Sequence, residues 1–283
     1  MTVGQPLRRR ITRLSGVLAA LVLAGLTPAP ASADRFDSYV ALGDSFAAGQ
    51  GAGPYLDACF RSTLGYPAVL DAAPKIGLTG NAACSGATTG SVRDSQIPVL
   101  SKKVDLVTVT AGGNDLDSIG ALAICAVDPG QACTDALAQR AAVLQTALAS
   151  PGTSPFFQDL LGMLNDIKAT APRADIYVAG YPLLFEPGAG PAADPINGLT
   201  QQLNAVIAAA AREADGGRAK VHFVDVSQAF AGHGIGSAQP WIVGPPTLCE
   251  ASATCGTSVA DIFHPTADGY TRGYAASITA ALG

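Results

Sequence analysis

Charged residues are scarce in this chain of 283 residues, at 14%, and aromatic residues make up only 6%, with a single Trp. The 17 basic side chains are outnumbered by 22 acidic ones, so the formal net charge is −5. Nucleic-acid binding needs a clustered positive field, and because the sequence assembles none, we expect no nucleic-acid partner. Hydrophobic residues nevertheless reach 48%, too high a share for a disordered protein, so the chain is expected to fold.

Several motifs that carry other chemistries are also missing. The chain has no Gly-x-Ser-x-Gly elbow, no His-Glu-x-x-His pair and no Gly-x-x-x-x-Gly-Lys loop, and its glycine-rich run at 49–53 lacks the dinucleotide-binding spacing. No Cys-x-x-Cys pair occurs, and none of His222, His233 and His264 lies at metal-ligand spacing from a Cys or another His. We therefore expect no metal ion and no organic cofactor, and we interpret His222 and His233 as structural or solvated.

The N-terminal segment has the order of a secretory signal peptide. Arginines at 8–10 and 13 precede an apolar stretch at 14–26, and small residues at 31–33 follow it. The apolar part is shorter than the roughly 20 residues that span a bilayer, and no later run reaches that length, so we expect no stable membrane anchor. Cleavage after Ala33 would leave a secreted, extracellular chain of residues 34–283 with 13 basic and 22 acidic side chains, a net charge of −9. The export route stays open, because consecutive arginines also suit a twin-arginine exporter.

All six cysteines lie in the part of the chain that would be exported, where disulfides persist. Six cysteines allow about 15 connectivities, and loop spacing favours one of them. The expected pairs are Cys125–Cys133, Cys249–Cys255 and, as the remaining pair, Cys59–Cys84.

Short apolar runs alternate with helix-like segments along residues 34–283. The runs that predict strands lie at 36–42, 76–81, 104–110, 174–179 and 221–226, and the helical segments lie at 66–73, 116–123, 134–148, 156–169, 195–214 and 266–282. This alternation favours one α/β domain, a three-layer sandwich in which helices cover both faces of a parallel sheet of about five strands. Two long Gly- and Pro-rich stretches, 182–198 and 231–258, are expected to form loops around a site.

Polar residues follow the predicted strands, which is where ligands bind in an open parallel sheet. The first strand ends in Gly43-Asp44-Ser45, the second leads to Ser85-Gly86, the third ends in Gly112-Gly113-Asn114-Asp115, and Asp261-x-x-His264-Pro265 precedes the last helix. Each block alone is typical of a helix cap or a turn. Together they supply what acyl transfer needs, namely a nucleophile, a base, a partner for the base and donors for the oxyanion.

In this order the four blocks resemble those of the GDSL or SGNH hydrolase family, and above all its secreted actinobacterial lipases and esterases. The resemblance spans nearly all of residues 34–283 and implies the family's flavodoxin-like fold. It also implies that Ser45 is the nucleophile, His264 the general base and then acid, and Asp261 the third member of a triad. The oxyanion hole would consist of the backbone N–H groups of Ser45 and Gly86 and the side chain of Asn114.

Two departures from the family pattern stand out. Phe46 replaces the Leu of the family's four-letter motif, a position at which the family varies. Related lipases tend to tie the middle loop to the later loop by a disulfide, whereas here Cys249 and Cys255 both lie in the later loop. Some relatives also orient the histidine through a backbone carbonyl, so this alternative to Asp261 stays open for His264.

We expect a monomeric serine esterase or lipase that hydrolyses fatty acyl esters through an acyl-enzyme on Ser45. Sugar acetates, phospholipids and thioesters remain alternatives, because the same site serves any activated acyl group. A secreted glycan- or lipid-binding protein with a retired site is disfavoured, since Ser45, Gly86, Asn114 and His264 are all intact. Sugar binding uses aromatic platforms that are rare here, and the aliphatic loop residues favour acyl chains: Leu183, Leu184, Phe185, Ile242 and Val243.

Overall fold

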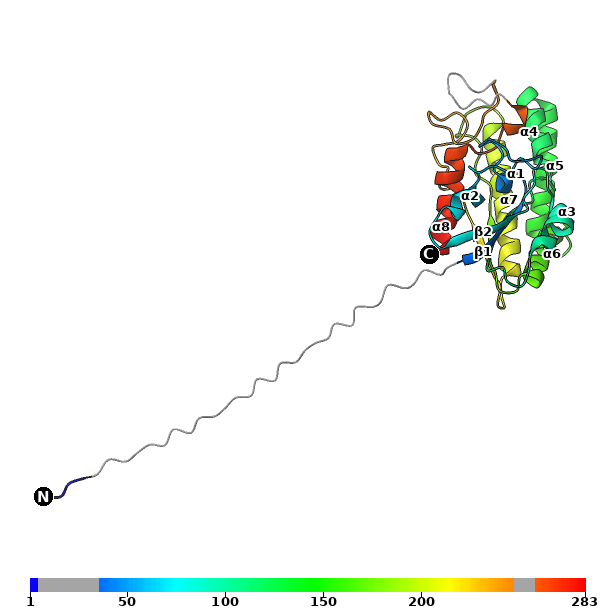
Figure 1. The fold of residues 1–283 in the computed structure, drawn as a ribbon. Coiled ribbons are helices and arrows are strands. Elements are labelled where there is room, and N and C mark those ends of the chain that lie inside the picture. Colours follow the sequence, from blue (N-terminus) through cyan, green and yellow to red (C-terminus); the bar gives the residue numbers. More distant parts are fainter. Residues whose placement is uncertain (5–35, 247–257) are drawn as a thin grey trace. The chain divides into compact units, whose positions relative to one another are not determined.

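A parallel sheet forms the central layer of the computed structural model, which describes residues 1–4, 36–246 and 258–283 (Figure 1). Its strands are β1 (Phe36–Gly43), β2 (Ile76–Asn81), β3 (Leu106–Thr110), β4 (Asp175–Ala179) and β5 (Lys220–Val224). The order across the sheet is β2-β1-β3-β4-β5, and all neighbouring strands are parallel. β3, with the sequence LVTVT, is buried at every position, as expected of a central strand covered on both faces. The prediction of a five-stranded parallel sheet is confirmed.

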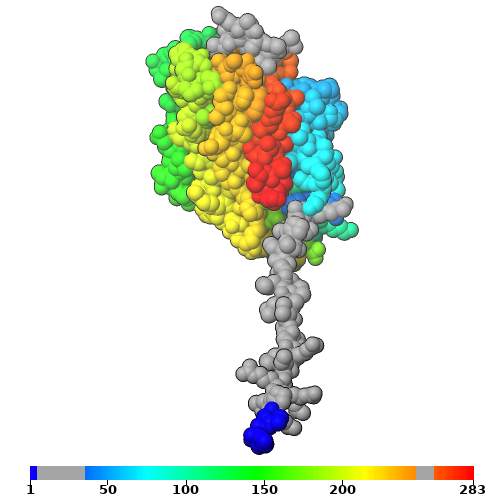
Figure 2. Space-filling model, turned by 90° about the vertical axis from the view of Figure 1, so that its left-hand side faces the viewer, coloured from blue at the N-terminus to red at the C-terminus, as the bar shows by residue number. Residues whose placement is uncertain are grey.

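Helices cover both faces of this sheet. They are α1 (Ser45–Ala48), α2 (Tyr66–Asp71), α3 (Thr89–Ser91), α4 (Ser118–Val127), α5 (Gln131–Ala149), α6 (Pro155–Thr170), α7 (Ala193–Ala214) and α8 (Ala276–Leu282). α5 and α6 pack against α7 on one side, and α2 packs against Gly269–Ala275, a π-helical segment that leads into α8, on the other (Figure 1). Figure 2 looks onto the second side, where the C-terminal residues, coloured red, run between the cyan and the yellow to orange segments. The predicted three-layer α/β sandwich is confirmed.

Two disulfides occur among the described residues, at pairs that the spacing predicts. Cys59–Cys84 joins the long loop before α2 to the loop after β2, and Cys125–Cys133 joins the end of α4 to the first turn of α5. The third predicted pair, Cys249–Cys255, lies outside the described residues, as does nearly all of the predicted signal peptide at 1–33. Residues 34–283 form one compact unit. None of the helices in the described ranges is both long and apolar enough to cross a membrane.

Candidate active site

The turn after β1 is built to place Ser45 at the start of a helix. Gly43 has φ +125, and a Cβ there would lie 2.2 Å from the carbonyl oxygen of Thr110 on β3, so only glycine fits beside the neighbouring strand. The Asp44 side chain caps the short helix α1 by accepting a hydrogen bond of 2.9 Å from the backbone N–H of Phe46. Ser45 is the first residue of α1 and is buried.

The structure brings Ser45 and His264 together across more than two hundred residues of chain. Nε2 of His264 lies 2.8 Å from Oγ of Ser45, and the residue is only 4% exposed. Burial lowers the pKa of His264 to about 4, against the opposing effect of a hydrogen bond to the backbone carbonyl of Ile262. The imidazole is therefore neutral at ordinary pH and able to accept a proton.

The hydrogen bond at Nδ1 differs from the one expected with the Asp261 carboxylate. Nδ1 of His264 lies 3.1 Å from the carbonyl oxygen of Ile262, and the Asp261 carboxylate accepts a hydrogen bond from the hydroxyl of Tyr55 instead. Phe263, between the carbonyl and the histidine, has the left-handed backbone angle φ +68. At this turn a main-chain oxygen lies where a side-chain partner was expected, which favours the backbone-carbonyl alternative.

Asn114 and Gly86, the other expected oxyanion donors, lie on neighbouring loops. Asn114 follows β3 and donates from Nδ2 to the carbonyl oxygen of Ala87, at 2.9 Å, so its amide is fixed against the residue that follows Gly86. Gly86 has φ +81, a conformation that glycine adopts without strain. Asn114 and Ser45 line the same pocket. An amide has two N–H bonds, so one can stay with Ala87 while the other faces a substrate.

Sequence reasoning missed Tyr181, the second residue after β4. Its hydroxyl donates to Oδ2 of Asp44, at 2.5 Å, and accepts from the backbone N–H of Gly113, at 3.0 Å. Burial raises the pKa of Asp44 to about 7, and the hydrogen bonds from Tyr181 and Phe46 act against that rise. The signal that could have found Tyr181 is the one that found the other blocks, a polar side chain just after a central strand.

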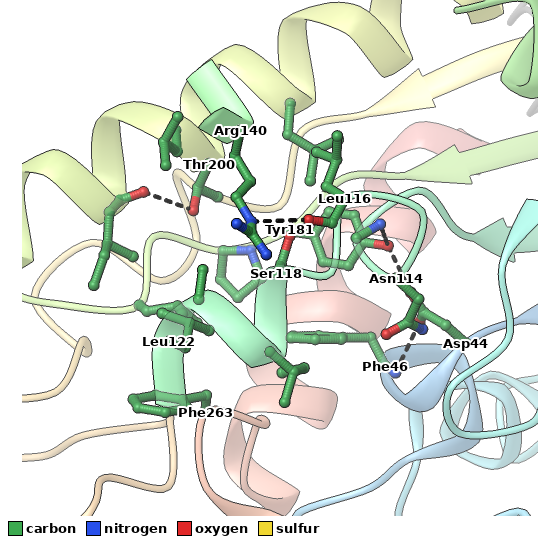
Figure 3. A pocket seen from close by; sticks show the side chains of 18 of the residues that line it. Asp44, Phe46, Asn114, Leu116, Ser118, Leu122, Arg140, Tyr181, Thr200 and Phe263 are labelled. Atoms are coloured by element: carbon green, nitrogen blue, oxygen red, sulfur yellow. Dashed lines mark hydrogen bonds between the residues drawn. The ribbon is translucent and has the colours of Figure 1, made fainter. Parts of the chain in front are cut away.

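An apolar pocket opens beside Ser45 and Asn114, with an empty volume of about 760 Å³ that includes space open to solvent. In Figure 3, Asp44 and Asn114 lie at one side of it, and Leu122 and Phe263 lie across from them. Most of its wall comes from α4, α5 and α7, through a set of aliphatic side chains: Ile119, Leu122, Leu137, Leu144, Ile196, Leu199 and Leu203.

The aliphatic loop residues have a different place from the one expected. Of the five, Leu184 lines the pocket. Val243 donates its backbone N–H to the carbonyl of His264, at 2.9 Å, and Ile242 pairs with Pro265, so these two residues support the histidine loop. His233 stacks on Trp241 and His222 on Tyr177, in agreement with structural roles. In the described ranges no group of three or more His, Cys, Asp or Glu residues could hold a metal ion.

A sequence model of the GDSL-like lipase/acylhydrolase family matches residues 41–272. The chain belongs to this family. It is 36% identical to a lipase of Streptomyces rimosus over 95% of this chain and 96% of that one, and 33% identical to Lipase 1 of Streptomyces coelicolor over 93% and 96%.

Solved structures of the family agree with the fold. A phospholipase A1 from Streptomyces albidoflavus superimposes with a TM-score of 0.74 at 29% identity, over 87% of this chain and 99% of that one. The extracellular lipase from Streptomyces rimosus gives a TM-score of 0.73 at 32% identity, over 86% and 99%. With its GDSL family membership and its lipase relatives, the chain is a carboxylic ester hydrolase, a serine esterase or lipase.

Proposed function

We propose that this esterase acts on fatty acyl esters, with Ser45 as nucleophile and His264 as general base and acid. The observation that carries the assignment is the distance of 2.8 Å between Ser45 Oγ and His264 Nε2. Because Nδ1 faces the carbonyl of Ile262, which can only accept, the single proton of the neutral imidazole lies on Nδ1. The lone pair of Nε2 is then directed at the serine hydroxyl.

The reaction follows from these positions. Oγ of Ser45 bonds to the ester carbonyl carbon while its proton passes to Nε2 of His264. The resulting oxyanion accepts hydrogen bonds from the backbone N–H groups of Ser45 and Gly86 and from Nδ2 of Asn114. When the C–O bond of the alcohol breaks, the imidazolium returns its proton to the leaving oxygen. Water then bonds to the acyl carbon while His264 takes its proton, and as the bond to Oγ breaks the imidazolium returns that proton to Ser45 and the acid leaves.

The pocket supports a fatty acyl group as the part of the substrate that it binds. Its aliphatic wall on α4, α5 and α7 begins beside the nucleophile and would remove a hydrocarbon chain from water, at about 0.8 kcal/mol for each buried methylene. An acetyl group would leave most of this wall unused. Since one structural relative is named a phospholipase A1, a phospholipid is the second candidate ester.

The test is a nitrophenyl ester series from acetate to palmitate with the wild-type chain, Ser45→Ala and His264→Ala. We expect kcat/KM to rise towards medium or long chains and to be abolished in both folded variants. Activity confined to acetate would overturn the fatty acyl assignment, and activity in Ser45→Ala would overturn the nucleophile. Release of fatty acid from a phospholipid in preference to simple esters would favour the second candidate.

A matched pair of variants on α4 tests the pocket itself. Leu122 lines the pocket, whereas Ile124, two residues further along the helix, is exposed. Leu122→Trp should reduce activity on the longest esters and spare acetate, because the larger ring fills the space for the chain. Ile124→Trp should leave the chain-length profile unchanged. Equal profiles in both variants would contradict the pocket assignment.

We infer further that the enzyme is exported, cut after Ala33 and active as a monomer. Two disulfides and the name of the extracellular relative from Streptomyces rimosus support export. Mass spectrometry of the protein from culture medium should find Asp34 at the N-terminus. Light scattering of the same sample should give the mass of a single chain.

A further inference from the structure

Tyr181 connects the two turns that carry the proposed nucleophile and the proposed oxyanion donor. Its hydroxyl lies 2.5 Å from Oδ2 of Asp44, the residue before Ser45, and 3.0 Å from the backbone nitrogen of Gly113, the residue before Asn114 (Figure 3). The turns follow β1 and β3, and Tyr181 follows β4, so one hydroxyl joins loops from three adjacent strands.

Both the backbone and the ring of Tyr181 are held by neighbouring residues. The side-chain amide of Asn204 on α7 accepts from the Tyr181 backbone N–H and donates to its carbonyl, both at 2.8 Å. The ring packs edge-to-face against Phe46, with centroids 5.1 Å apart, and the residue is only 6% exposed. The backbone of Tyr181 is therefore fixed from α7, outside the two turns that its hydroxyl joins, and its ring packs against Phe46 on the first of them.

An oxyanion donor contributes only when it lies at hydrogen-bond distance from the oxygen as the transition state forms. Hydrogen bonds between strands fix β1 and β3 in the sheet. Ser45 and Asn114 lie beyond the last residues of these strands, so the strand-to-strand hydrogen bonds do not fix their positions. On the side of the β2 loop, Asn114 is fixed by its bond to Ala87. The hydroxyl of Tyr181 supplies the second constraint, on the side of β4.

We propose that Tyr181 is a positioning residue that fixes the distance between Ser45 and the amide of Asn114. The inference rests on the roles proposed above for those two residues. Tyr181 acts through Asp44 and Gly113 and contributes to kcat, since the alignment that it provides matters most in the transition state. It contributes little to substrate binding, because its ring stays in the pocket wall when the hydroxyl is removed.

The matched pair of variants is Tyr181→Phe and Tyr39→Phe. Tyr39 on β1 is fully buried and has a hydroxyl at 2.7 Å from Oγ1 of Thr108, in the middle of the sheet. Both changes remove one buried hydroxyl and should lower the melting temperature. Tyr181→Phe takes this partner from Asp44 and Gly113, and Tyr39→Phe takes it from Thr108. We expect Tyr181→Phe to lower kcat by about 10- to 100-fold with KM changed less than about twofold, whereas Tyr39→Phe keeps the wild-type kcat.

A double-mutant cycle with Asn114→Ala separates positioning from a general loss of order. If Tyr181 acts through the placement of Asn114, removal of its hydroxyl costs much less kcat in the Asn114→Ala background than in the wild type. Multiplicative losses, a change in KM alone, or an equal loss of kcat in Tyr39→Phe would overturn the inference. If Tyr181→Phe does not fold, Asn204→Ala, which releases the Tyr181 backbone and keeps the hydroxyl, must show the same loss of kcat.

The same assays include Ser45→Ala, so that failure of the positioning role and failure of the proposed function give different results. Loss of activity in Ser45→Ala together with a wild-type kcat in Tyr181→Phe would overturn the inference and leave the proposed function intact. Activity retained in Ser45→Ala would overturn the proposed function, and the positioning role with it.

Discussion

Acidification is the perturbation to which the buried histidine should give the clearest response. Burial lowers the pKa of His264 from 6.5 to about 4. The shift corresponds to about 3 kcal/mol in favour of the neutral ring, at 1.36 kcal/mol for each unit. A general base must be neutral to accept the proton of Ser45, so activity is present above the pKa of the folded protein and is lost as the pH falls through it. The acid limb of kcat/KM should therefore lie near pH 4.

The size of the effect is large enough to measure. At about pH 5, a base with a pKa of about 4 is about nine-tenths neutral, whereas a solvated imidazole would be only about 3% neutral. The assay is kcat/KM for a short nitrophenyl ester across the acid range, with samples returned to neutral pH to check that activity recovers. An acid limb between about pH 6 and 7 that coincides with the titration of the His264 ring would refute the reasoning, because it would mean that water reaches the ring.

The chain offers a direct control for this titration. It contains three histidines, so the double variant His222→Gln/His233→Gln leaves His264 as the single source of an imidazole proton signal. Titration of that signal by nuclear magnetic resonance should give the same pKa as the rate profile. Disagreement between the two values would mean that another group controls the acid limb.

Three substitutions test other parts of the site and the fold. Asp261→Asn should lower kcat less than about tenfold, because Ile262 supplies the partner of the imidazole; a loss near 10⁴-fold in the kinetic assay would restore the carboxylate triad. Asn114→Ala should lower kcat by about 100- to 1000-fold at a nearly unchanged melting temperature, and a large KM effect alone would speak against an oxyanion role. Gly43→Ala should destabilise the fold by about 3 kcal/mol or more in urea denaturation, since its Cβ would meet the Thr110 carbonyl; wild-type stability would show that the turn can relax.

The sheet and the contact between Ser45 and His264 were accessible to sequence reasoning because both have local signals. Buried parallel strands appear as short apolar, β-branched runs, and β3 is the clearest case. Ser45 and His264 stand in blocks whose order and composition match a known hydrolase pattern. The carboxyl ends of parallel strands explain the place of Ser45 after β1. His264 stands on a loop before the C-terminal helix, and its family block, rather than a strand end, pointed to the contact of 2.8 Å with Ser45.

The partner of the imidazole and the wall of the pocket had no such signal. Every residue has a backbone carbonyl, so the sequence does not single out the one of Ile262. Its contact with the imidazole depends on the left-handed backbone of Phe263, a conformation that a phenylalanine rarely adopts and that its residue type does not predict. The helix α4, with the sequence SIGALAICAV, is apolar on all sides, and its periodicity cannot say which face meets the pocket. The loop residues expected there, such as Ile242, instead support the histidine.

A large part of the pocket wall is encoded apart from Ser45 and His264 in the chain. Ser45 and His264 stand near the two ends of the described body, whereas α4 and α5, joined by Cys125–Cys133, form one contiguous stretch inserted between β3 and β4. Mutation, insertion or exchange within that stretch alters the space offered to the acyl chain without touching the reacting atoms. Substrate range can therefore diverge within this fold while the hydrolytic mechanism is inherited unchanged.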